Sequence, residues 1–427
     1  MRIDKIYIKN FKRFSEVEIP FNNQFNLIIG DNGSGKTAIL EALTVAMGSY
    51  FLGLKNTDSR LIRESDVKLQ SFEFSEEYQF PVVVAAEGYI EEEHLQWSRE
   101  LNSLSSGTSS RNTSEIRRLS EHYDSLLRSG TLFTMPVLAY YSTGRLFRNV
   151  DGRNSETSKR TVASRLRAYR NCLQAASNFK IFLKWYKSKE QAAIQKKEED
   201  LSLALIRDLI KRNLPNCKNF FYEFDEDRIQ GLKVEQEDGT ILPFEYLSDG
   251  TRNIFALMAD IAYRCLVLNP HLKENALQDT PGIILIDELD LHLHPEWQKQ
   301  IVNSLKNSFR NIQFITTSHS PFIIQEMAEG QLIKLKDGEV SISGGDQLSI
   351  EDIAETKQEV DNPQWSEKKK DLYEAAEEYY KALESGDPTE DMEAKMSELT
   401  KPFSQNPAYD AFLEQVRLTK EENETSS

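Results

Sequence analysis

Eight residues, 30–37, match the pattern G-x-x-x-x-G-K-[ST], whose residue types are suited to binding phosphate groups. Its glycines allow a tight backbone turn that directs N–H groups at phosphate oxygens without a Cβ in the way. Lys36 offers a positive charge to the β- and γ-phosphates, and the Thr37 hydroxyl is placed to ligate Mg²⁺. We therefore expect this chain to bind a nucleoside triphosphate. The nucleotide-binding residues of this loop are Gly30, Asp31, Asn32, Gly33, Ser34, Gly35, Lys36 and Thr37.

A second group of chemically competent residues follows an apolar run at 283–286, where Asp287 and Glu288 stand side by side. Hydrolysis of a Mg²⁺-bound nucleotide needs this pair: Asp287 anchors the metal, and Glu288 polarises the attacking water. A third apolar run, at 314–317, is followed by His319, which can hydrogen-bond the γ-phosphate or the water. A lone histidine is more often structural, but this order of motifs favours the nucleotide role.

Two further contacts have a structural and a functional interpretation. Ser248, Asp249 and Gly250 open an expected helix, where a hydroxyl, a backbone N–H and a helix N-terminus suit an anion. The same residues would also serve as an ordinary N-cap. Arg13 lies in the connection between the first two expected strands, where it either reaches the nucleotide or stays on the surface.

The elements that must position these residues can be read from the apolar pattern. The run Phe25 to Ile29 is typical of a buried strand that leads into the phosphate loop, and residues 37–43 predict the helix that follows it. A helix N-terminus at that point would face the phosphates. Residues 80–90 predict a strand in an antiparallel layer, and residues 136–145 predict a buried strand followed by a turn.

Charge is distributed unevenly along the chain. The net charge of −16 argues against nucleic-acid binding by the surface as a whole. Residues 157–213 nevertheless contain 14 Lys and Arg against 5 Asp and Glu, whereas residues 351–427 contain 21 Asp and Glu against 9 Lys and Arg. A basic stretch and an acidic tail indicate separate partners or faces, and two amphipathic regions with solvated charges explain them equally well.

The composition is that of an ordinary globular protein, with 39% apolar and 28% charged residues in 427. No apolar run approaches the roughly 18–20 residues needed to cross a bilayer. The N-terminus alternates like a strand and lacks the apolar segment of a signal peptide. Cys172, Cys217 and Cys265 are too scattered for a disulfide framework or a metal cluster. We expect a cytoplasmic protein.

In this order, GDNGSGKT, LSDGT, ILIDE and the final histidine resemble the Walker A, signature, Walker B and switch motifs of ABC-type ATPases. Lys36 and Ser248 are 212 residues apart, which leaves room for a long insertion between two lobes. The run Asp287 to Pro295 is similar to the DE-x-x-x-x-LHP run of the SMC/RecF/OLD branch. Within that branch the insertion is too short for a coiled-coil arm, and no Toprim nuclease pattern follows His319.

The run YYSTGR at 140–145, the helical insertion and the tail with Asn406-Pro407-Ala408-Tyr409 most resemble the PtuA ATPases of Septu and retron-associated antiphage systems. The resemblance implies ATP and Mg²⁺ as cofactors and a head-to-head dimer, alone or within a higher oligomer. It also implies an HNH nuclease partner of the PtuB kind, through which DNA is reached. In a retron context it implies a reverse transcriptase and its non-coding RNA as well.

The resemblance implies an α/β fold: an ABC-type ATPase head with an antiparallel β layer, a helical insertion and a C-terminal helical tail. We expect an N-terminal ATPase lobe at 1–150, with a mobile insert at 98–130, and a basic helical insertion at 151–215. The C-terminal lobe, with signature, Walker B and switch motifs, is expected at 216–345. An acidic helical tail at 346–427 would contact a partner or another copy.

One departure and one competing interpretation accompany this resemblance. Where the superfamily has its Q-loop glutamine, this chain has Ser142 and Thr143, so one of these or a water would complete the Mg²⁺ shell. The main alternative is a DNA-repair ATPase of the RecF or SMC kind that acts directly on DNA, which the basic insertion favours. A transporter ATPase and an intrinsic nuclease are disfavoured by the long insertion and by the scattered histidines.

Overall fold

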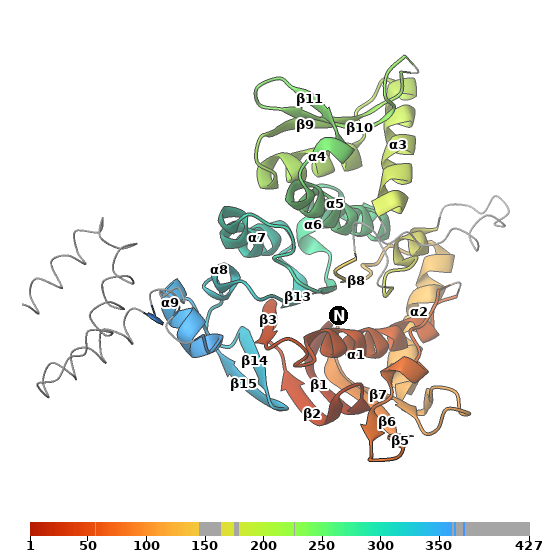
Figure 1. The fold of residues 1–427 in the computed structure, drawn as a ribbon. Helices are drawn as coiled ribbons and strands as arrows, with labels where there is room; N and C mark the ends of the chain where they lie inside the picture. The colour runs from red at the N-terminus through yellow and green to blue at the C-terminus, as the bar shows by residue number, and fades with distance from the viewer. Residues whose placement is uncertain are drawn as a thin grey trace, which may run out of the picture. The chain divides into compact units, whose positions relative to one another are not determined.

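The strands predicted around the phosphate loop lie in one six-stranded sheet with the order β15-β14-β3-β13-β12-β8 (Figure 1). Five neighbouring strands run parallel, and β15 pairs antiparallel at one edge. The strands are β3 Phe25–Gly30, β8 Val137–Tyr141, β12 Gly282–Ile286, β13 Ile312–Thr317, β14 Leu332–Lys336 and β15 Glu339–Ser343. Parallel strands covered on both faces need continuous apolar sequence, and every residue of β8, β12 and β13 is buried.

The long helices cover the two faces of this sheet. Helix α1 Lys36–Gly48 contacts β3 and β13 on one side and a second, antiparallel sheet on the other. Helices α5 Asp249–Leu268 and α7 Pro295–Ser308 lie on the opposite face of the parallel sheet (Figure 1). Because α1 is enclosed between two sheets, 11 of its 13 residues are buried, which places the helix after the phosphate loop in the centre of the core.

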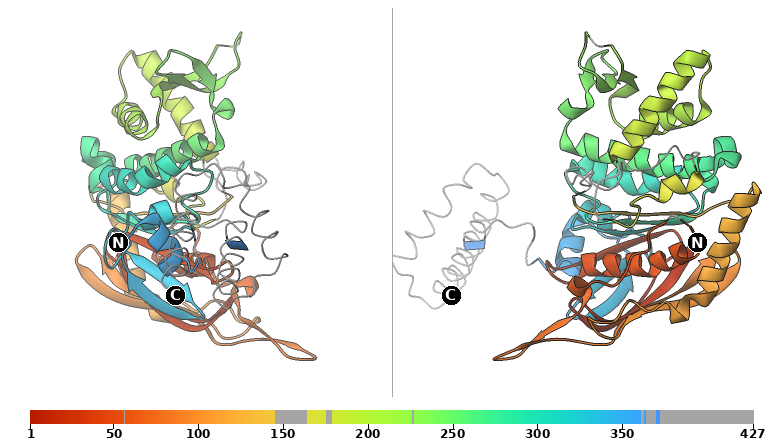
Figure 2. Two further views of the ribbon diagram at one scale, coloured as in Figure 1. Left: turned by 60° about the vertical axis from the view of Figure 1, so that its left-hand side comes forward. Right: turned by 90° about the vertical axis from the view of Figure 1, so that its right-hand side faces the viewer.

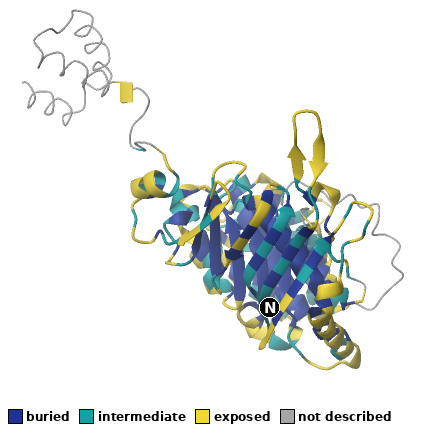
Figure 3. Cartoon of the chain, turned by 90° about the horizontal axis from the view of Figure 1, so that it is seen from below, coloured by how far each residue is buried: buried dark blue, intermediate teal, exposed yellow. Residues whose placement is uncertain are grey.

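The antiparallel layer has the strand order β2-β1-β6-β7. Its strands are β1 Arg2–Phe11, β2 Phe14–Pro20, β6 Val82–Ile90 and β7 Glu93–Leu101. Burial alternates at every position of β6, as a sheet with one face on the core requires. The strand that the sequence predicts at 80–90, in an antiparallel layer, is therefore present. Figure 3 shows this alternation on the face of the layer.

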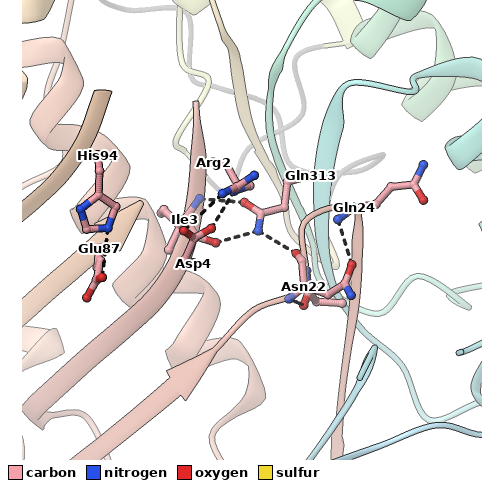
Figure 4. A network of polar contacts seen from close by, with 9 residues as sticks. Arg2, Ile3, Asp4, Asn22, Gln24, Glu87, His94 and Gln313 are labelled. Carbon is pink, nitrogen blue, oxygen red and sulfur yellow. Dashed lines mark hydrogen bonds and ion pairs between the residues drawn. The ribbon is translucent and has the colours of Figure 1, made fainter. Parts of the chain in front are cut away.

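A buried glutamine joins the two sheets. Gln313 of β13 accepts a hydrogen bond from the backbone N–H of Ile3 at 2.9 Å and donates one to the carbonyl of the same residue at 2.7 Å. Its amide also donates to the carbonyl of Asn22 at 2.9 Å (Figure 4). Gln313 is 2% exposed, so these bonds satisfy backbone groups that water does not reach.

The insertion between the lobes contains two helices and a small sheet (Figure 2). Helices α3 Phe179–Lys196 and α4 Leu201–Asn213 precede the strands β9 Cys217–Glu223, β10 Gly231–Gln236 and β11 Ile241–Pro243. A turn at Asp238-Gly239 connects β10 and β11, with Gly239 at a φ of +85°. Trp185 and Tyr186 are both buried. Trp185 packs edge-on against Tyr263, and Tyr186 stacks on Phe220, so both belong to the core.

The stretch 98–130 differs from the mobile insert that its composition predicts. It contains the end of β7 and the helix α2 Ser114–Ser129. Residues 103–114 are mostly polar, but an amphipathic helix begins at residue 114. Ile116, Leu119 and Tyr123 share its buried face. The short hairpin of β4 Leu69–Ser71 and β5 Glu76–Tyr78 projects from the same lobe with all six strand residues exposed (Figure 3).

The computed structural model describes residues 1–55, 57–144, 164–174, 179–225, 227–360, 363, 370 and 371. The chain divides into two compact units, 1–353 and 354–427, and a single core joins the predicted lobes and insertion within the first. The predicted tail helices and the run Asn406 to Tyr409 lie outside the described residues. No helix in the described part of the chain is long and apolar enough to cross a membrane.

The remaining short elements are η1 Ser49–Leu52, η2 Glu64–Asp66, η3 Arg111–Thr113, η5 Arg165–Tyr169, η6 Phe244–Tyr246, η7 Pro270–Asn275, α6 Ala276–Asp279, α8 Pro321–Ile324, α9 Ile350–Asp352 and the π-helix η8 Ile353–Lys357.

Replacing Gln313 by Leu keeps a side chain of similar size between the sheets but removes its hydrogen bonds to the Ile3 N–H and to the carbonyls of Ile3 and Asn22, of which the Asn22 carbonyl keeps the Asn26 amide as a partner. We expect Gln313→Leu to lower the free energy of unfolding by about 2–4 kcal/mol, because buried unpaired polar groups carry their full desolvation cost. The measurement is urea unfolding followed by circular dichroism. Gln300→Leu, on the exposed side of α7, is the control. An unchanged urea midpoint for Gln313→Leu would contradict this prediction.

Candidate nucleotide-binding site

The predicted nucleotide residues meet at the carboxyl ends of the parallel strands. The phosphate loop leaves β3, the acidic pair leaves β12 and His319 follows β13, and these three strands are neighbours in the sheet. Ligands of open α/β sheets bind at this edge. A cavity of about 360 Å³ lies here. It is lined by Lys12, Arg13, Asn32, Gly33, Gly35, Lys36, Thr37, Ala38, Asp287, Glu288 and His319.

The loop backbone requires glycine where it passes the strand connection. Gly35 has a φ of +104°, and a Cβ there would lie 2.5 Å from the Phe14 ring and 2.8 Å from Cδ of Arg13. The close packing of Phe14 and Arg13 against Gly35 brings the β1–β2 connection to the cavity wall. Arg13 therefore lines the cavity. The sequence had left open whether this side chain reaches the nucleotide or stays on the surface.

The phosphate loop has groups that can bind an anion. Lys36 donates hydrogen bonds to the carbonyls of Gly30 at 2.8 Å and Asp31 at 2.9 Å, so its ammonium lies inside the curl of the loop. Burial lowers the pKa of Lys36, against the attraction of the Asp287 and Asp31 carboxylates. The buried Ser34 hydroxyl makes no hydrogen bond within the described chain. A buried cation and an orphaned hydroxyl fit a phosphate group, and Lys36 opens α1, whose positive end adds to this fit.

Asp287 is the most constrained side chain of the site. The Thr37 hydroxyl donates to its Oδ2 at 2.9 Å, and the Thr317 hydroxyl donates to its Oδ1 at 2.7 Å. The backbone N–H of Asp287 donates to the Tyr141 carbonyl at 2.8 Å, which ties β12 to β8. The hydroxyl of Thr37 and the carboxylate of Asp287 are hard oxygen donors, which fit Mg²⁺. The described residues contain no cluster of three or more His, Cys, Asp or Glu for a metal, so Mg²⁺ would keep phosphate and water ligands.

Glu288 is held in an unusual backbone conformation beside this pair. Its φ is +49°, a left-handed value that non-glycine residues adopt only when the surroundings impose it. The N–H of Glu288 donates to the Thr317 hydroxyl at 2.8 Å, and the next N–H, of Leu289, donates to the Thr317 carbonyl at 2.8 Å. These bonds turn the Glu288 side chain into the cavity that His319 also lines.

Three residues at the site were not identified from the sequence: Ala38, which lines the cavity, Thr317 and Lys12. Thr317 is fully buried and orients both acids, and the only signal for it is its place two residues before His319. Lys12 lines the cavity next to Arg13 and forms an ion pair with Glu41 of α1. Burial lowers the pKa of Lys12. Nothing in the strand connection distinguishes Lys12 from a surface lysine before the fold is known.

Ser248, Asp249 and Gly250 do not line this cavity. Ser248 is exposed and caps α5, because its hydroxyl accepts a hydrogen bond from the Thr251 N–H at 3.3 Å. Asp249 pairs with Arg252 one turn along the helix. The N-cap interpretation therefore holds, and these three residues lie apart from Lys36 within one chain. Ser142 and Thr143, at the Q-loop position, do not line the cavity either.

Comparisons with known proteins show the family to which the chain belongs. A family model described as "AAA domain, putative AbiEii toxin, Type IV TA system" matches residues 25–325. The chain is similar to the Retron Vc95 probable ATPase of Vibrio cholerae, with 29% identity over 385 residues, which cover 78% of this chain and 73% of that protein. It is also similar to the Septu protein PtuA of Bacillus mycoides, with 42% identity over 95 residues, which cover 22% of this chain and 13% of that protein.

Among solved structures, the chain is similar to an Smc head domain with an extended coiled coil, bound to the C-terminal domain of ScpA and derived from Pyrococcus furiosus. The TM-score is 0.46 at 17% identity, and the match covers 84% of this chain and 99% of that one. The family model spans well over half of the chain and includes both the phosphate loop and the acidic pair. The chain belongs to this AAA-domain family and is an ABC-type ATPase of the SMC/RecF kind, related to retron and Septu ATPases.

Proposed function

We propose that this chain is the ATPase of an antiphage defence system, in which it forms ATP-bridged dimers that scaffold and gate a partner HNH nuclease. Its similarity to a retron ATPase and to Septu PtuA supports the defence role. DNA is reached through the nuclease, and a retron setting adds a reverse transcriptase and its RNA. The proposal includes Mg²⁺ as a cofactor. It also includes the predicted division of the chain into two ATPase lobes, an insertion and a tail, at 1–150, 216–345, 151–215 and 346–427 respectively.

The observation that carries the dimer is the separation of the two halves of the ATP site. Lys36 lies in the cavity, whereas Ser248 is exposed at the N-terminus of the 20-residue helix α5 and does not reach it. The positive end of this long helix, where Ser248 is exposed, suits the γ-phosphate held by a second chain. An isologous pair would complete two such sites, so that ATP favours the closed dimer and its hydrolysis releases it.

Within each site the residues of this chain divide the work. Lys36 and the loop N–H groups bind and orient the phosphates, with Arg13 at the same wall of the cavity. Thr37 and Asp287 would hold Mg²⁺, which when bound neutralises charge on the phosphate oxygens. Glu288 accepts a hydrogen bond from the attacking water and polarises it, and His319 hydrogen-bonds the γ-phosphate or that water.

Replacing Glu288 by Gln removes the charge that polarises water and leaves the size of the side chain unchanged. We expect Glu288→Gln to abolish hydrolysis, to keep ATP bound and to accumulate the dimer in size-exclusion chromatography with ATP. Co-expression with the neighbouring reading frame should yield a complex whose plasmid cleavage responds to ATP. A chain that forms no complex, and instead binds DNA alone in a salt-sensitive manner, would favour a RecF-like repair ATPase.

The buried Thr317 offers a test of how Asp287 is organised. Thr317→Val removes the hydroxyl that bonds both Asp287 and the Glu288 N–H, and we expect kcat for ATP to fall by about tenfold or more. Thr316→Val is the matched control: it is equally buried, but its hydroxyl bonds the Asn26 carbonyl, away from the site. Equal rates for the two variants would contradict the assigned role of Thr317.

The acidic tail is proposed as the contact for the nuclease, on the basis of its net negative charge. Because residues 1–353 form a compact unit of their own, we expect a chain ending at residue 353 to retain ATP hydrolysis. We also expect it to lose co-purification with the nuclease in a pull-down from co-expressing cells. Full recovery of the nuclease with the shortened chain would contradict the contact.

A further inference from the structure

A glutamine outside the cavity connects the turn that carries His319 to the loop that follows the acidic pair. Gln298 lies in the first turns of α7, and its amide nitrogen donates to the Leu293 carbonyl at 2.8 Å. The hydroxyl of Ser320, the residue after His319, donates to the amide oxygen of Gln298 at 2.6 Å. A carbonyl can only accept, so the Leu293 oxygen fixes which end of the amide faces it. Helices α7 and α8 lie side by side at this point (Figure 1).

The Ser320 hydroxyl both donates and accepts a hydrogen bond in this arrangement. It donates its proton to Gln298 and accepts a hydrogen bond from the Phe322 N–H at 3.1 Å, which caps the short helix α8. Ser320 is only 5% exposed, so no water can replace the amide easily. Gln298 therefore helps to hold the backbone directly after His319, together with the Ser318 hydroxyl, which accepts a hydrogen bond from the Ser320 N–H at 2.9 Å.

The loop on the other side of Gln298 is strained. Glu288 and His292 have φ values of +49° and +63°, neither of which suits a side chain with a Cβ. Two turns, from the Leu291 N–H to the Glu288 carbonyl at 3.0 Å and from the Leu293 N–H to the Asp290 carbonyl at 2.9 Å, curl this loop. Such a conformation persists only where its surroundings hold it, and the Gln298 amide holds its last carbonyl.

The helix that carries Ser248 rests on the same loop. Asn253 of α5 donates from its amide to the Leu291 carbonyl at 2.8 Å. A Cβ at Gly250 would lie 2.4 Å from the His292 carbonyl oxygen, so the helix and the loop are in direct backbone contact there. The loop at 288–293 is thus held from one side by α5 and from the other by Gln298.

We propose that Gln298 is a positioning residue for ATP hydrolysis, which sets the position of His319 through Ser320 and couples it to α5 through the loop at 288–293. The inference rests on the proposed roles of His319 and Ser248. It adds the route by which a contact at Ser248 affects the position of His319. A second chain that engages Ser248 presses on α5, and Asn253, the loop and Gln298 carry that contact to His319. Gln298 touches no substrate in this scheme.

The test is a double-mutant cycle on the full chain, with kcat and KM for ATP as readouts. Gln298→Met keeps the length of the side chain and loses both hydrogen bonds, and we expect kcat to fall about tenfold with KM changed less than about threefold. In a His319→Ala background the same substitution should change kcat by less than about twofold, because its target is gone. An equal fold loss in both backgrounds would overturn the proposal.

Substitutions of Ser320 separate positioning from simple structural support. Ser320→Ala removes the bond to Gln298 and should lower kcat like Gln298→Met, whereas Ser320→Thr keeps a hydroxyl and should restore most of the rate. Gln300→Met, two residues along α7 and exposed, is the control for the helix. A loss in Gln298→Met that appears as weaker ATP binding or a lower melting temperature, with unchanged kcat, would also overturn the proposal.

Failure of the proposed function would look different. Wild-type chain and nuclease that give cells no protection from phage would contradict the defence role, while the kinetic cycle would still report on Gln298. Conversely, a protecting system in which Gln298→Met hydrolyses ATP at the wild-type rate would overturn the coupling and leave the defence role standing.

Discussion

Two threonine hydroxyls fix the orientation of the Asp287 carboxylate, and the arrangement of the site depends on the orientation of that carboxylate. Thr37 comes from the helix after β3, and Thr317 comes from the end of β13, so the pair of hydrogen bonds joins three strand ends at one point. The arrangement is possible only because β12, β13 and β3 are adjacent and parallel, with their carboxyl ends at one edge. A carboxylate with both oxygens bonded cannot rotate freely, so its remaining lone pairs face a fixed direction. Glu288 is oriented by the same threonine and inherits this rigidity.

The chemistry of the site was predictable because it is carried by short motifs. Residues 30–37 specify their own backbone, and the strand before them and the helix after them follow from continuous apolar sequence. The acidic pair was predictable because it ends a strand, and position at a strand end does not depend on sheet order. Eight of the residues that line the cavity accordingly belong to these motifs: Asn32, Gly33, Gly35, Lys36, Thr37, Asp287, Glu288 and His319.

What the sequence did not reveal depends on which elements become neighbours. Thr317 is one of two adjacent threonines, and only the alternation of faces along β13 sends its hydroxyl to Asp287 and that of Thr316 to Asn26. Lys12 enters the cavity because α1 lies under the β1–β2 connection, where Glu41 pairs with it. Gln298 lies three residues after Pro295, where the sequence alone suggests a surface position, and its bond to Ser320 forms only because α7 packs beside α8.

The position of α5 limits how nucleotide binding can change this chain. Its residues Asp260 and Arg264 form an ion pair at 2.8 Å, both almost fully buried, and the Tyr141 hydroxyl at the end of β8 donates to Asp260 at 2.7 Å. Burial raises the pKa of Tyr141, so the phenol stays protonated and remains the donor. Both members of this pair lie on α5, so the Tyr141 hydroxyl is the contact that joins the buried pair to β8.

Rotation of α5 away from β8 would break this buried hydrogen bond and remove a partner of the Asp260 carboxylate, which makes it an unfavourable route for a conformational change. Ser248 at the start of α5 therefore keeps a fixed relation to the sheet edge at which Asp287 lies, and the loop at 288–293 adds a second contact between them. Because α5 and the sheet edge are fixed relative to each other within one chain, two chains can move relative to each other more easily than α5 can move within its own chain. Under the proposed function, ATP then acts by bringing two rigid surfaces together, and the adjustments that follow within each chain are small, because even the turn after His319 is held by several hydrogen bonds of Ser320.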